Sequence, residues 1–420
     1  MTTPILALHG GSKTITQPIA GWPQFGTKDQ DFLVRALKDS QHCASQARAV
    51  GYTVRFEEEF ARYHGRKFGV ACSNCTQGLE GVLAIAGIGP GDEVLVPSYT
   101  FMATASSVIR AGAIPVFVDI DPDTMCTNAR LLEAGRTQKT KAAIPVHFGG
   151  YLEDMRAIHD WAQAHGILIL EDAAQAHGSC RDGYHAGAFS MGAVFSFQRN
   201  KNMCAGEGGI FVTDDEDLKT KFKEFIWHGM KIGGAEGHHS IASNLRITEF
   251  QSAILLAQLE NLAGQDRRRM SACNALDAAI GMIEGFRPLK LAPLTSHARH
   301  LYMFKIDQEF WGSTPKKRIH EALIAEGVTC GTGYAYPLYR NPVFNNKNFT
   351  EFYRRANKPS FDAGLLDFRN TLLPNVEIAC QEIMTIPHFV FLSDFDVAGK
   401  IAEALTKVAK NRKTLEQVPA

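Results

Sequence analysis

Seven short apolar runs recur along the first half of the chain, and they constrain its fold more than any other feature. They are rich in Val, Ile and Phe, and they occupy residues 68–72, 93–97, 114–118, 142–146, 167–171, 193–197 and 209–213. Most of them are separated by helix-like stretches, among them 76–86, 103–111 and 152–165. Continuous apolar strands that alternate with helices are typical of a mostly parallel sheet buried on both faces. The sequence therefore predicts an α/β fold.

The pattern changes after Thr248, and this change indicates how the chain is organised into domains. A long helical pattern follows, and beyond it come strand-like 301–306, helix-like 315–327, a Pro- and Asn-rich loop at 337–349 and a final helix near 396–410. This mixed order fits a smaller α+β domain. We expect an N-terminal segment at 1–50, a large α/β domain at 51–285 and a small C-terminal domain at 286–420.

Charge and hydropathy argue against several classes of protein. The 44 Lys and Arg residues balance the 44 Asp and Glu residues, and no basic block indicates nucleic acid. The apolar runs are too short to span a membrane, and the start, "MTTPILALHGGSK", does not read as a secretion signal. Nine sparse cysteines are most simply reduced thiols. We expect a cytoplasmic protein with no nucleic-acid or membrane partner.

A CxxC pair, Cys72 and Cys75, raises the question of redox or metal chemistry. No second CxxC and no nearby pair of histidines at ligand spacing accompanies it. We therefore interpret the two cysteines as small residues in a buried strand-to-helix turn, and we expect no metal site.

Ligands of open α/β sheets bind at the carboxyl ends of the strands, where four unusual stretches fall. In "SNCTQGLEG", Thr76 and Gln77 begin a helix whose free N–H groups favour a phosphate, although such a residue is usually only a cap. In "PSYTFMATA", Tyr99 and Phe101 offer aromatic rings. Phe101 is the better candidate to stack on a flat ring, although an isolated aromatic here is more often core.

The other two stretches carry an acid and an amine. In "ILILEDAAQAHGS", the strand ends in Glu171 and Asp172, and an acid there can pair with a protonated ring nitrogen. A helix cap or a surface ion pair is about as common a role. In "FSFQRNKNMCAGEGG", Ser196 is a hydroxyl donor for phosphate and Lys201 follows five residues later. A lone lysine is usually a solvated loop residue, but a buried one must be neutralised, paired or chemically employed.

Together the four stretches predict a pyridoxal 5′-phosphate (PLP) site. A phosphate cradle, a stacking aromatic, an acid for the ring nitrogen and an amine for the Schiff base are the parts that this cofactor requires. The glycine-rich "GGAEGHH" follows a helix-like region and lies too late in the chain for a dinucleotide-binding loop.

The same motifs resemble the DegT/DnrJ/StrS family of sugar aminotransferases, which belongs to fold type I of the PLP enzymes. The resemblance runs from roughly Phe56 to the last helix. Its strongest parts are "EDAAQAHGS", "FSFQRNKNMCAGEGGIFVTDD" and "SNLRITEFQSAILLAQL". It implies a homodimer whose two subunits share each active site.

The resemblance also implies roles for single residues. Lys201 would bind the cofactor and shuttle the proton, Asp172 would face the pyridine nitrogen, and Gln175 would lie near the ring hydroxyl. The remaining cofactor contacts would be Thr76, Gln77 and Ser196 at the phosphate, Phe101 on the ring face, and Asn244 at the phosphate of the neighbouring subunit.

Lysine at position 201 favours an aminotransferase over the family's sugar 3-dehydratases, which carry histidine there. The motifs are similar to those of glutamine:scyllo-inosose aminotransferases, and also to 3-amino-5-hydroxybenzoate synthases, which aromatise an aminocyclohexene acid. We expect amino transfer from glutamine or glutamate to a keto-cyclitol or keto-sugar in secondary metabolism of the aminoglycoside type. A synthase of the second kind is the alternative.

Three positions depart from the family pattern. Cys75 stands where glycine is common, Gly78 where alanine is common, and Tyr339 where many members have a substrate-side histidine. We expect the loop "YAYPLYRNP" to line the acceptor pocket, with Tyr336 and Tyr339 as substrate contacts, although tyrosines on surface loops are usually solvated. The identity of the acceptor and of the donor stays open.

Overall fold

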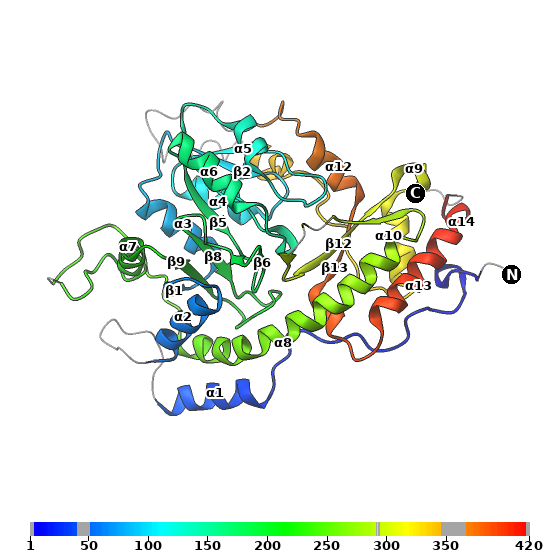
Figure 1. Ribbon diagram of the computed structural model, residues 1–420, viewed down its shortest axis with the longest axis horizontal. Coiled ribbons are helices and arrows are strands. Elements are labelled where there is room, and N and C mark those ends of the chain that lie inside the picture. The colour runs from blue at the N-terminus through cyan, green and yellow to red at the C-terminus, as the bar shows by residue number, and fades with distance from the viewer. Residues whose placement is uncertain are drawn as a thin grey trace.

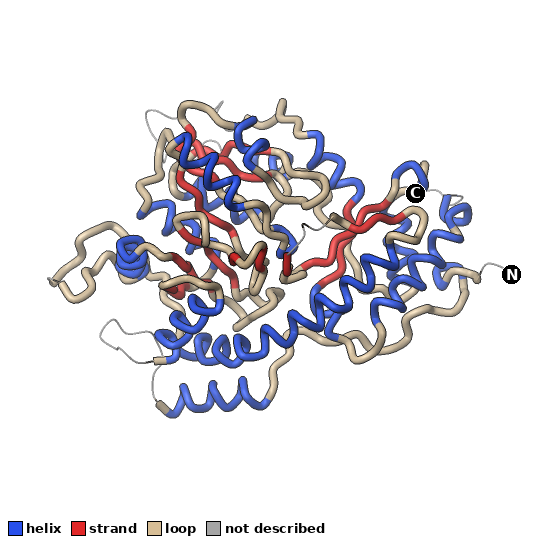
Figure 2. Tube along the Cα trace, in the orientation of Figure 1, coloured by secondary structure: helices blue, strands red, loops and turns tan. Residues whose placement is uncertain are grey.

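The protein folds around two sheets that are joined by one long helix. The structure, a computed structural model, describes residues 4–39, 51–234, 236–290, 292, 295–345 and 367–416. Figure 1 shows the large sheet on one side of the molecule, a smaller sheet on the other, and α8 (Glu249–Ile280) running past both. Figure 2 shows that helices flank each sheet.

The large sheet has seven strands in the order β1-β9-β8-β5-β4-β2-β3. Strand β9 is antiparallel to both of its neighbours, β1 and β8. All other neighbouring strands of this sheet pair in parallel. The strands are β1 (Phe68–Cys72), β2 (Glu93–Pro97), β3 (Ile114–Val118), β4 (Thr140–Ala143), β5 (Leu168–Asp172), β8 (Gly192–Ser196) and β9 (Gly209–Thr213). This confirms the expected α/β fold with a mostly parallel sheet.

Both faces of the large sheet are buried, because successive side chains of a strand point to opposite layers. Val194 packs in a core with residues of α3, α4 and α7, whereas Phe195 packs with residues of α2 and α8. A further apolar layer joins β2 to α5 and α6 through Leu95. These helices are α2 (Tyr52–Tyr63), α3 (Cys75–Ile85), α4 (Met102–Arg110), α5 (Ala129–Gly135), α6 (Met155–His165) and α7 (Glu216–Ile226).

The small sheet is antiparallel and has its own core. Its order is β10 (Phe286–Pro288), β12 (Leu301–Ile306) and β13 (Ile383–Pro387). That core also takes residues from the second half of α8. The helices that follow α8 are α9 (Gln308–Trp311), α10 (Lys316–Ala325), α12 (Pro374–Glu382), α13 (Val397–Lys410) and α14 (Arg412–Glu416). The division into domains at 50 and 285 stays a prediction.

Most expected elements lie within two residues of their observed bounds, but one strand was wrong in its position. The run 142–146 was expected as a strand, whereas β4 spans Thr140–Ala143. Pro145 has no N–H to donate to a ladder, so regular pairing stops before it and only Val146 forms an isolated bridge, to Asp172. The short sheet β6 (Cys180–Arg181), β7 (Tyr184–His185) and β11 (Thr295–Ser296) was not predicted, nor was helix α1 (Thr27–Lys38).

The apolar face of α8 has an explanation within the chain itself. Leu255, Leu256, Leu259 and Leu262 are buried in the core that also holds the aromatic side chains of α2. Ordinary core packing therefore accounts for these leucines without a subunit interface. Among the described residues, none of the helices combines the length and the apolar character that crossing a membrane requires.

Candidate active site

A cavity of about 750 Å³ opens where the parallel strands of the large sheet end and the small sheet approaches them. The first sheet contributes residues that follow β1, β2, β5 and β8, as expected for an open α/β sheet. The part of the chain that carries the small sheet contributes residues at the start of β12, in β13 and in the segment that follows α10. The lining residues include Asn74, Thr76, Thr100, Phe101, Asp172, Gln175, Ser196, Lys201, Glu207, His300, Gly331, Thr332, Gly333, Tyr334 and Thr385.

The start of α3 forms one end of this cavity. The Asn74 side chain caps the helix by accepting the Gln77 N–H at 2.9 Å, and Thr76 lines the cavity beside it. A Cβ on Gly209, the first residue of β9, would lie 2.7 Å from the Cys75 nitrogen, so only glycine fits there. Ser196, the last residue of β8, faces the same space. A helix N-terminus with adjacent hydroxyls suits a phosphate.

Gln77 does not line the cavity. Its side-chain oxygen accepts hydrogen bonds from the Ser73 hydroxyl and the Asn74 amide instead. Its predicted phosphate contact therefore has no support from the side chain, and it stays a prediction.

Asp172 ends β5 with its carboxylate held by neutral groups. Thr104 Oγ1 donates to one oxygen at 2.8 Å and the Ala174 N–H donates to the other at 3.2 Å. The residue is 6% exposed and forms no ion pair within the described part of the chain. Because this carboxyl group lines the cavity beside Lys201, it is placed to pair with a positive group on a ligand.

Gln175, three residues further on, has a fixed amide orientation. Its oxygen accepts the Gly149 N–H at 2.7 Å. Because the Gly149 N–H is a donor, the amide oxygen of Gln175 must face it. The NH₂ group of the same amide is then left to face the cavity that Gln175 lines. The amide can therefore donate to an oxygen on a ligand ring.

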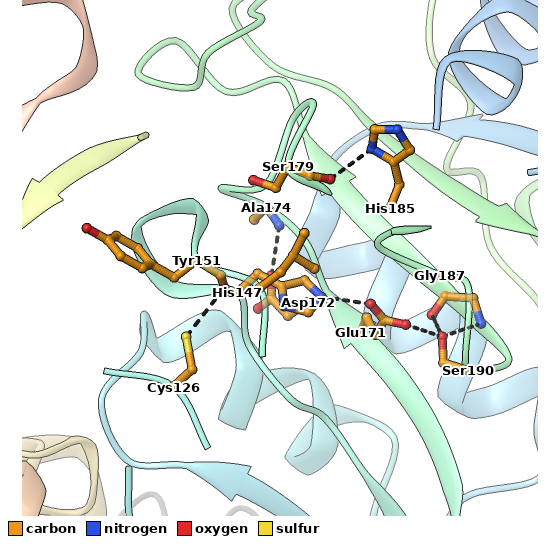
Figure 3. Close-up of polar contacts among 12 residues, drawn as sticks. Cys126, His147, Tyr151, Glu171, Asp172, Ala174, Ser179, His185, Gly187 and Ser190 are labelled. Atoms are coloured by element: carbon orange, nitrogen blue, oxygen red, sulfur yellow. Dashed lines mark hydrogen bonds and ion pairs between the residues drawn. The ribbon is translucent and has the colours of Figure 1, made fainter. Parts of the chain in front are cut away.

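Glu171, beside Asp172, serves the framework behind the site (Figure 3). His147 Nε2 lies 2.7 Å from one of its carboxylate oxygens, and the Ser190 hydroxyl donates to the other. The His147 backbone N–H also donates to the Asp172 carbonyl at 3.1 Å. Three chain segments are thereby joined at the strand end that carries Asp172.

Lys201 lies in the loop between β8 and β9, with its backbone N–H donating to the Gln198 carbonyl at 2.8 Å. The side chain is half-buried and reaches the cavity. Burial lowers its pKa below the usual lysine range, and the nearby Asp172 and Cys75 counteract this only in part. A larger fraction of neutral amine is what a nucleophilic lysine needs.

Phe101 is not a core residue. Its side chain is 64% exposed, it immediately precedes α4 and it lines the cavity. An open aromatic face on a cavity wall is suited to stacking on a planar ligand.

Asn244 lies outside the cavity of its own chain. It is exposed and forms an isolated bridge with Trp227, and the next carbonyl, of Leu245, accepts the Ser73 N–H at 2.7 Å. The segment is therefore bonded to Ser73, close to the start of α3, at the end of the cavity that Thr76 lines, and the Asn244 side chain is exposed. Its predicted contact with a second subunit stays a prediction.

The structure does not bring the two predicted substrate tyrosines to the cavity of the described chain. Tyr339 is 2% exposed, and its hydroxyl donates to Glu377 at 2.6 Å. Tyr336 is 44% exposed and lines no part of the cavity. Tyr334, in the same loop, lines it instead, as does His300. The tyrosine-rich loop itself indicated in the sequence that this segment lines the cavity. The spacing of its tyrosines did not reveal which ring faces the cavity.

The CxxC pair lies as interpreted. Cys72 ends β1 and Cys75 begins α3, and both thiols are free and buried. Burial raises the pKa of Cys72 to about 12 and holds that of Cys75 well above its usual range, so neither is a ready thiolate. Gly78 is explained by packing, because a Cβ there would lie 2.7 Å from a methyl group of Val194.

The fold and the cavity are those of a fold type I aminotransferase, the class that uses PLP. A model of the DegT/DnrJ/EryC1/StrS aminotransferase family matches residues 30–363. The chain therefore belongs to this aminotransferase family.

Individual relatives are similar over nearly the whole chain. L-glutamine:scyllo-inosose aminotransferase of Streptomyces griseus is 32% identical, over 97% of this chain and 98% of the relative. L-glutamine:2-deoxy-scyllo-inosose aminotransferase of Streptomyces kanamyceticus is 33% identical, over 98% of each. The crystal structure of 3-amino-5-hydroxybenzoic acid synthase superposes with a TM-score of 0.81 at 28% identity, and the match covers 94% of this chain and 99% of that one.

Proposed function

We propose that the protein binds PLP and transfers the amino group of L-glutamine to a keto-cyclitol. The observation that carries the proposal is the set of complementary groups around one cavity. A lysine of lowered pKa, a buried carboxyl group that forms no ion pair with the described residues, an amide NH₂ and an open aromatic face all line it, beside a helix N-terminus. Each group fits one part of PLP, so the residues present suit the cofactor.

The residues of this chain have separable tasks in the reaction. PLP, when bound, supplies an electron sink for the carbon that loses its proton. Lys201 Nζ accepts the proton from the α-carbon of the amino donor and returns a proton to the carbon that receives nitrogen. Asp172 supplies the negative charge that keeps a ring nitrogen protonated, and Thr104 fixes its carboxylate. Gln175 would donate to the ring hydroxyl oxygen of the cofactor, and Thr76 and Ser196 would hold its phosphate.

The choice of a keto-cyclitol is supported by the relatives and by the cavity lining. Both Streptomyces relatives named above are glutamine-dependent enzymes of inosose substrates. Among the described residues that line the cavity, Lys201 is the one lysine or arginine, and the others that can bond a substrate are mostly hydroxyls and amides. Such a lining suits a neutral polyhydroxylated ring, whereas the diphosphate of a nucleotide-linked sugar would meet no cation other than Lys201 among the described residues that this subunit contributes.

A synthase that aromatises an aminocyclohexene acid is the second candidate. It is favoured by the structural similarity to 3-amino-5-hydroxybenzoic acid synthase. The acid substrate of such an enzyme would leave as an aromatic product with strong ultraviolet absorption, which separates the two candidates directly.

The test is amino transfer from glutamine labelled with ¹⁵N at the α-amino group. The PLP-loaded protein is incubated with this donor and, in separate reactions, scyllo-inosose, 2-deoxy-scyllo-inosose, a nucleotide-linked ketosugar and an aminocyclohexene acid. We expect ¹⁵N in an aminocyclitol, as read by mass spectrometry. Label only in the nucleotide-linked sugar, or an aromatic product alone, would contradict the proposal.

A further inference from the structure

His300 lines the active-site cavity from the small-sheet side, immediately before β12. We propose that His300 is a specificity residue for the acceptor substrate and that its Nε2 atom accepts a hydrogen bond from a ring hydroxyl of the cyclitol. The proposal rests on the proposed function, and it names one residue that recognises the class of acceptor substrate.

A chain of hydrogen bonds fixes which nitrogen of His300 carries the proton. Asn202 Nδ2 donates to the Ala298 carbonyl at 2.7 Å, so the Asn202 oxygen points the other way. That oxygen lies 3.0 Å from His300 Nδ1. An amide oxygen can only accept, so Nδ1 carries the hydrogen and Nε2 carries a lone pair.

The ring is also held against rotation. His388 stacks on it at a centroid distance of 5.6 Å and an interplanar angle of 26°, and the His388 N–H donates to the His300 carbonyl at 3.1 Å. His388 is fixed in turn by its Nε2 contact with the Asn200 carbonyl at 3.2 Å. Asn200 and Asn202 flank Lys201, so the loop that positions the lysine positions His300 as well.

The lone pair of Nε2 is available to a ligand. Nε2 makes no hydrogen bond with the described part of the chain, although the residue is buried and lines the cavity. Burial holds the pKa of His300 well below its usual range, and the positive Lys201 and Arg269 and the neighbouring His388 and His177 act in the same direction. The imidazole is therefore neutral near neutral pH, and it is an acceptor at Nε2.

The chemistry of the two substrates decides what Nε2 contacts. A carboxylate has no hydrogen to donate and would be repelled by a lone pair, whereas each hydroxyl of a cyclitol can donate. The side-chain amide of glutamine is the other possible donor. Since the two substrates react in separate half-reactions, measuring each half-reaction alone distinguishes the two contacts.

The experiment uses the PLP-loaded enzyme and the variant His300→Phe. Glutamine alone is added first, and the loss of the cofactor's visible absorption reports the donor half-reaction. Keto-cyclitol is then added, and recovery of the band reports the acceptor half-reaction. We expect the donor rate to be unchanged and the acceptor kcat/KM to fall by roughly 10- to 100-fold, the effect of one lost hydrogen bond in a buried site.

A series of keto-cyclitols, each lacking one ring hydroxyl, identifies the contact. Removal of the hydroxyl that contacts His300 should lower the acceptor kcat/KM of the wild-type enzyme. The same removal should not lower the kcat/KM of His300→Phe any further, because this variant has already lost the hydrogen-bond partner of that hydroxyl. The fully hydroxylated ring without a ketone gives a second readout, its dissociation constant, which should rise in the same variant. His300→Gln keeps an acceptor atom and should recover part of the loss, and it serves if the phenylalanine variant fails to fold.

His297→Phe is the matched control, since His297 is equally buried but does not line the cavity. It should leave both half-reactions unchanged. Equal losses in the two half-reactions, or deoxy substrates that lose the same factor in wild type and His300→Phe at every position, would overturn the proposal. If the wild-type enzyme accepts no keto-cyclitol at all, the proposed function fails instead.

Discussion

At the scale of single residues, the site depends on the surroundings of two ionisable side chains, Asp172 and Lys201. The Asp172 side chain accepts hydrogen bonds from two neutral donors, Thr104 and the backbone of Ala174, and burial lowers the pKa of Lys201. Asp172 can therefore stabilise a cation, and Lys201 can more readily act as a neutral amine. Asp172 enters the cavity from the end of β5 and Lys201 from the loop between β8 and β9, so a ligand can bind between them.

Replacing Asp172 with Asn tests the first of these roles. The amide has nearly the same shape but no charge, so a ring nitrogen would lose its proton and the electron sink would weaken. We expect kcat at saturating PLP to fall by a factor on the order of 10² to 10⁴, the range of one positioned catalytic group.

The matched control for Asp172→Asn is Asp119→Asn. Asp119 follows β3 and is also buried, but its carboxylate accepts the N–H groups of Asn375 and Val376 at the start of α12. This variant should be less stable and keep its turnover per loaded site. Near wild-type turnover in PLP-saturated Asp172→Asn would refute the role of Asp172.

The sequence predicts much of the site because its main residues follow strands directly. Asp172 and Ser196 are the last residues of strands, and Phe101 follows one closely, so the parallel sheet alone brings them to one edge. Tyr334 and His300 were missed because their place depends on the second sheet packing against the first. The burial of Tyr339 could not be foreseen for a similar reason, since its hydroxyl donates to Glu377, far along the chain, and its predicted substrate contact stays a prediction without support from the cavity lining.

At the scale of secondary-structure elements, the packing of α2 on β1 brings a carboxyl group into the core. Gly69 lies so close that a Cβ would meet the Glu57 carbonyl at 2.6 Å, and the Glu57 side chain accepts the Ala71 N–H at 2.9 Å. Burial raises the pKa of Glu57 from 4.5 to about 7, with Glu249 adding to the shift and Lys223 and Lys219 opposing it. Periodicity predicted both elements, but no pattern in the sequence predicts that this acid faces inward.

The raised pKa of Glu57 predicts a pH dependence of stability. The folded protein holds a proton that the unfolded chain releases between pH 4.5 and about 7, so stability falls as pH rises through that window. Glu57→Gln removes this effect and keeps an oxygen for the Ala71 N–H. We expect the variant to be more stable than wild type by up to ~3 kcal/mol above the window and to lose this advantage below it.

Urea unfolding of both proteins on either side of this window measures the Glu57 effect. Glu59→Gln is the control, because Glu59 lies on the same helix and pairs with Arg55 at the surface. A wild-type and Glu57→Gln difference that does not change with pH would contradict the account.

At the scale of the whole molecule, each site is proposed to be shared between two subunits. Asn244 is exposed, but its segment bonds to Ser73 beside the start of α3, where the phosphate is proposed to bind. In a two-fold dimer each such segment meets its own copy, so Asn244 would complete the partner's site. The buried leucines of α8 do not support this interface, because they pack in the core of their own chain.

Complementation tests the shared site. Lys201→Ala and Asn244→Asp are made in separate chains, each homodimer is confirmed to be inactive, and the two are then co-expressed with different tags. One site of the heterodimer would carry both changes and the other would carry neither. Activity should copurify with the heterodimer. Inactive heterodimers would place Asn244 in the site of its own chain.

The most direct test of the whole account is to find which lysine carries the cofactor. The PLP-loaded protein is reduced with borohydride, digested and mapped by mass spectrometry. We expect the visible absorption to disappear and the cofactor to be fixed to the peptide that contains Lys201, with no fixed cofactor in Lys201→Ala, which should also be inactive. Fixation to another lysine, such as Lys67 or Lys219, would contradict the assignment of the site.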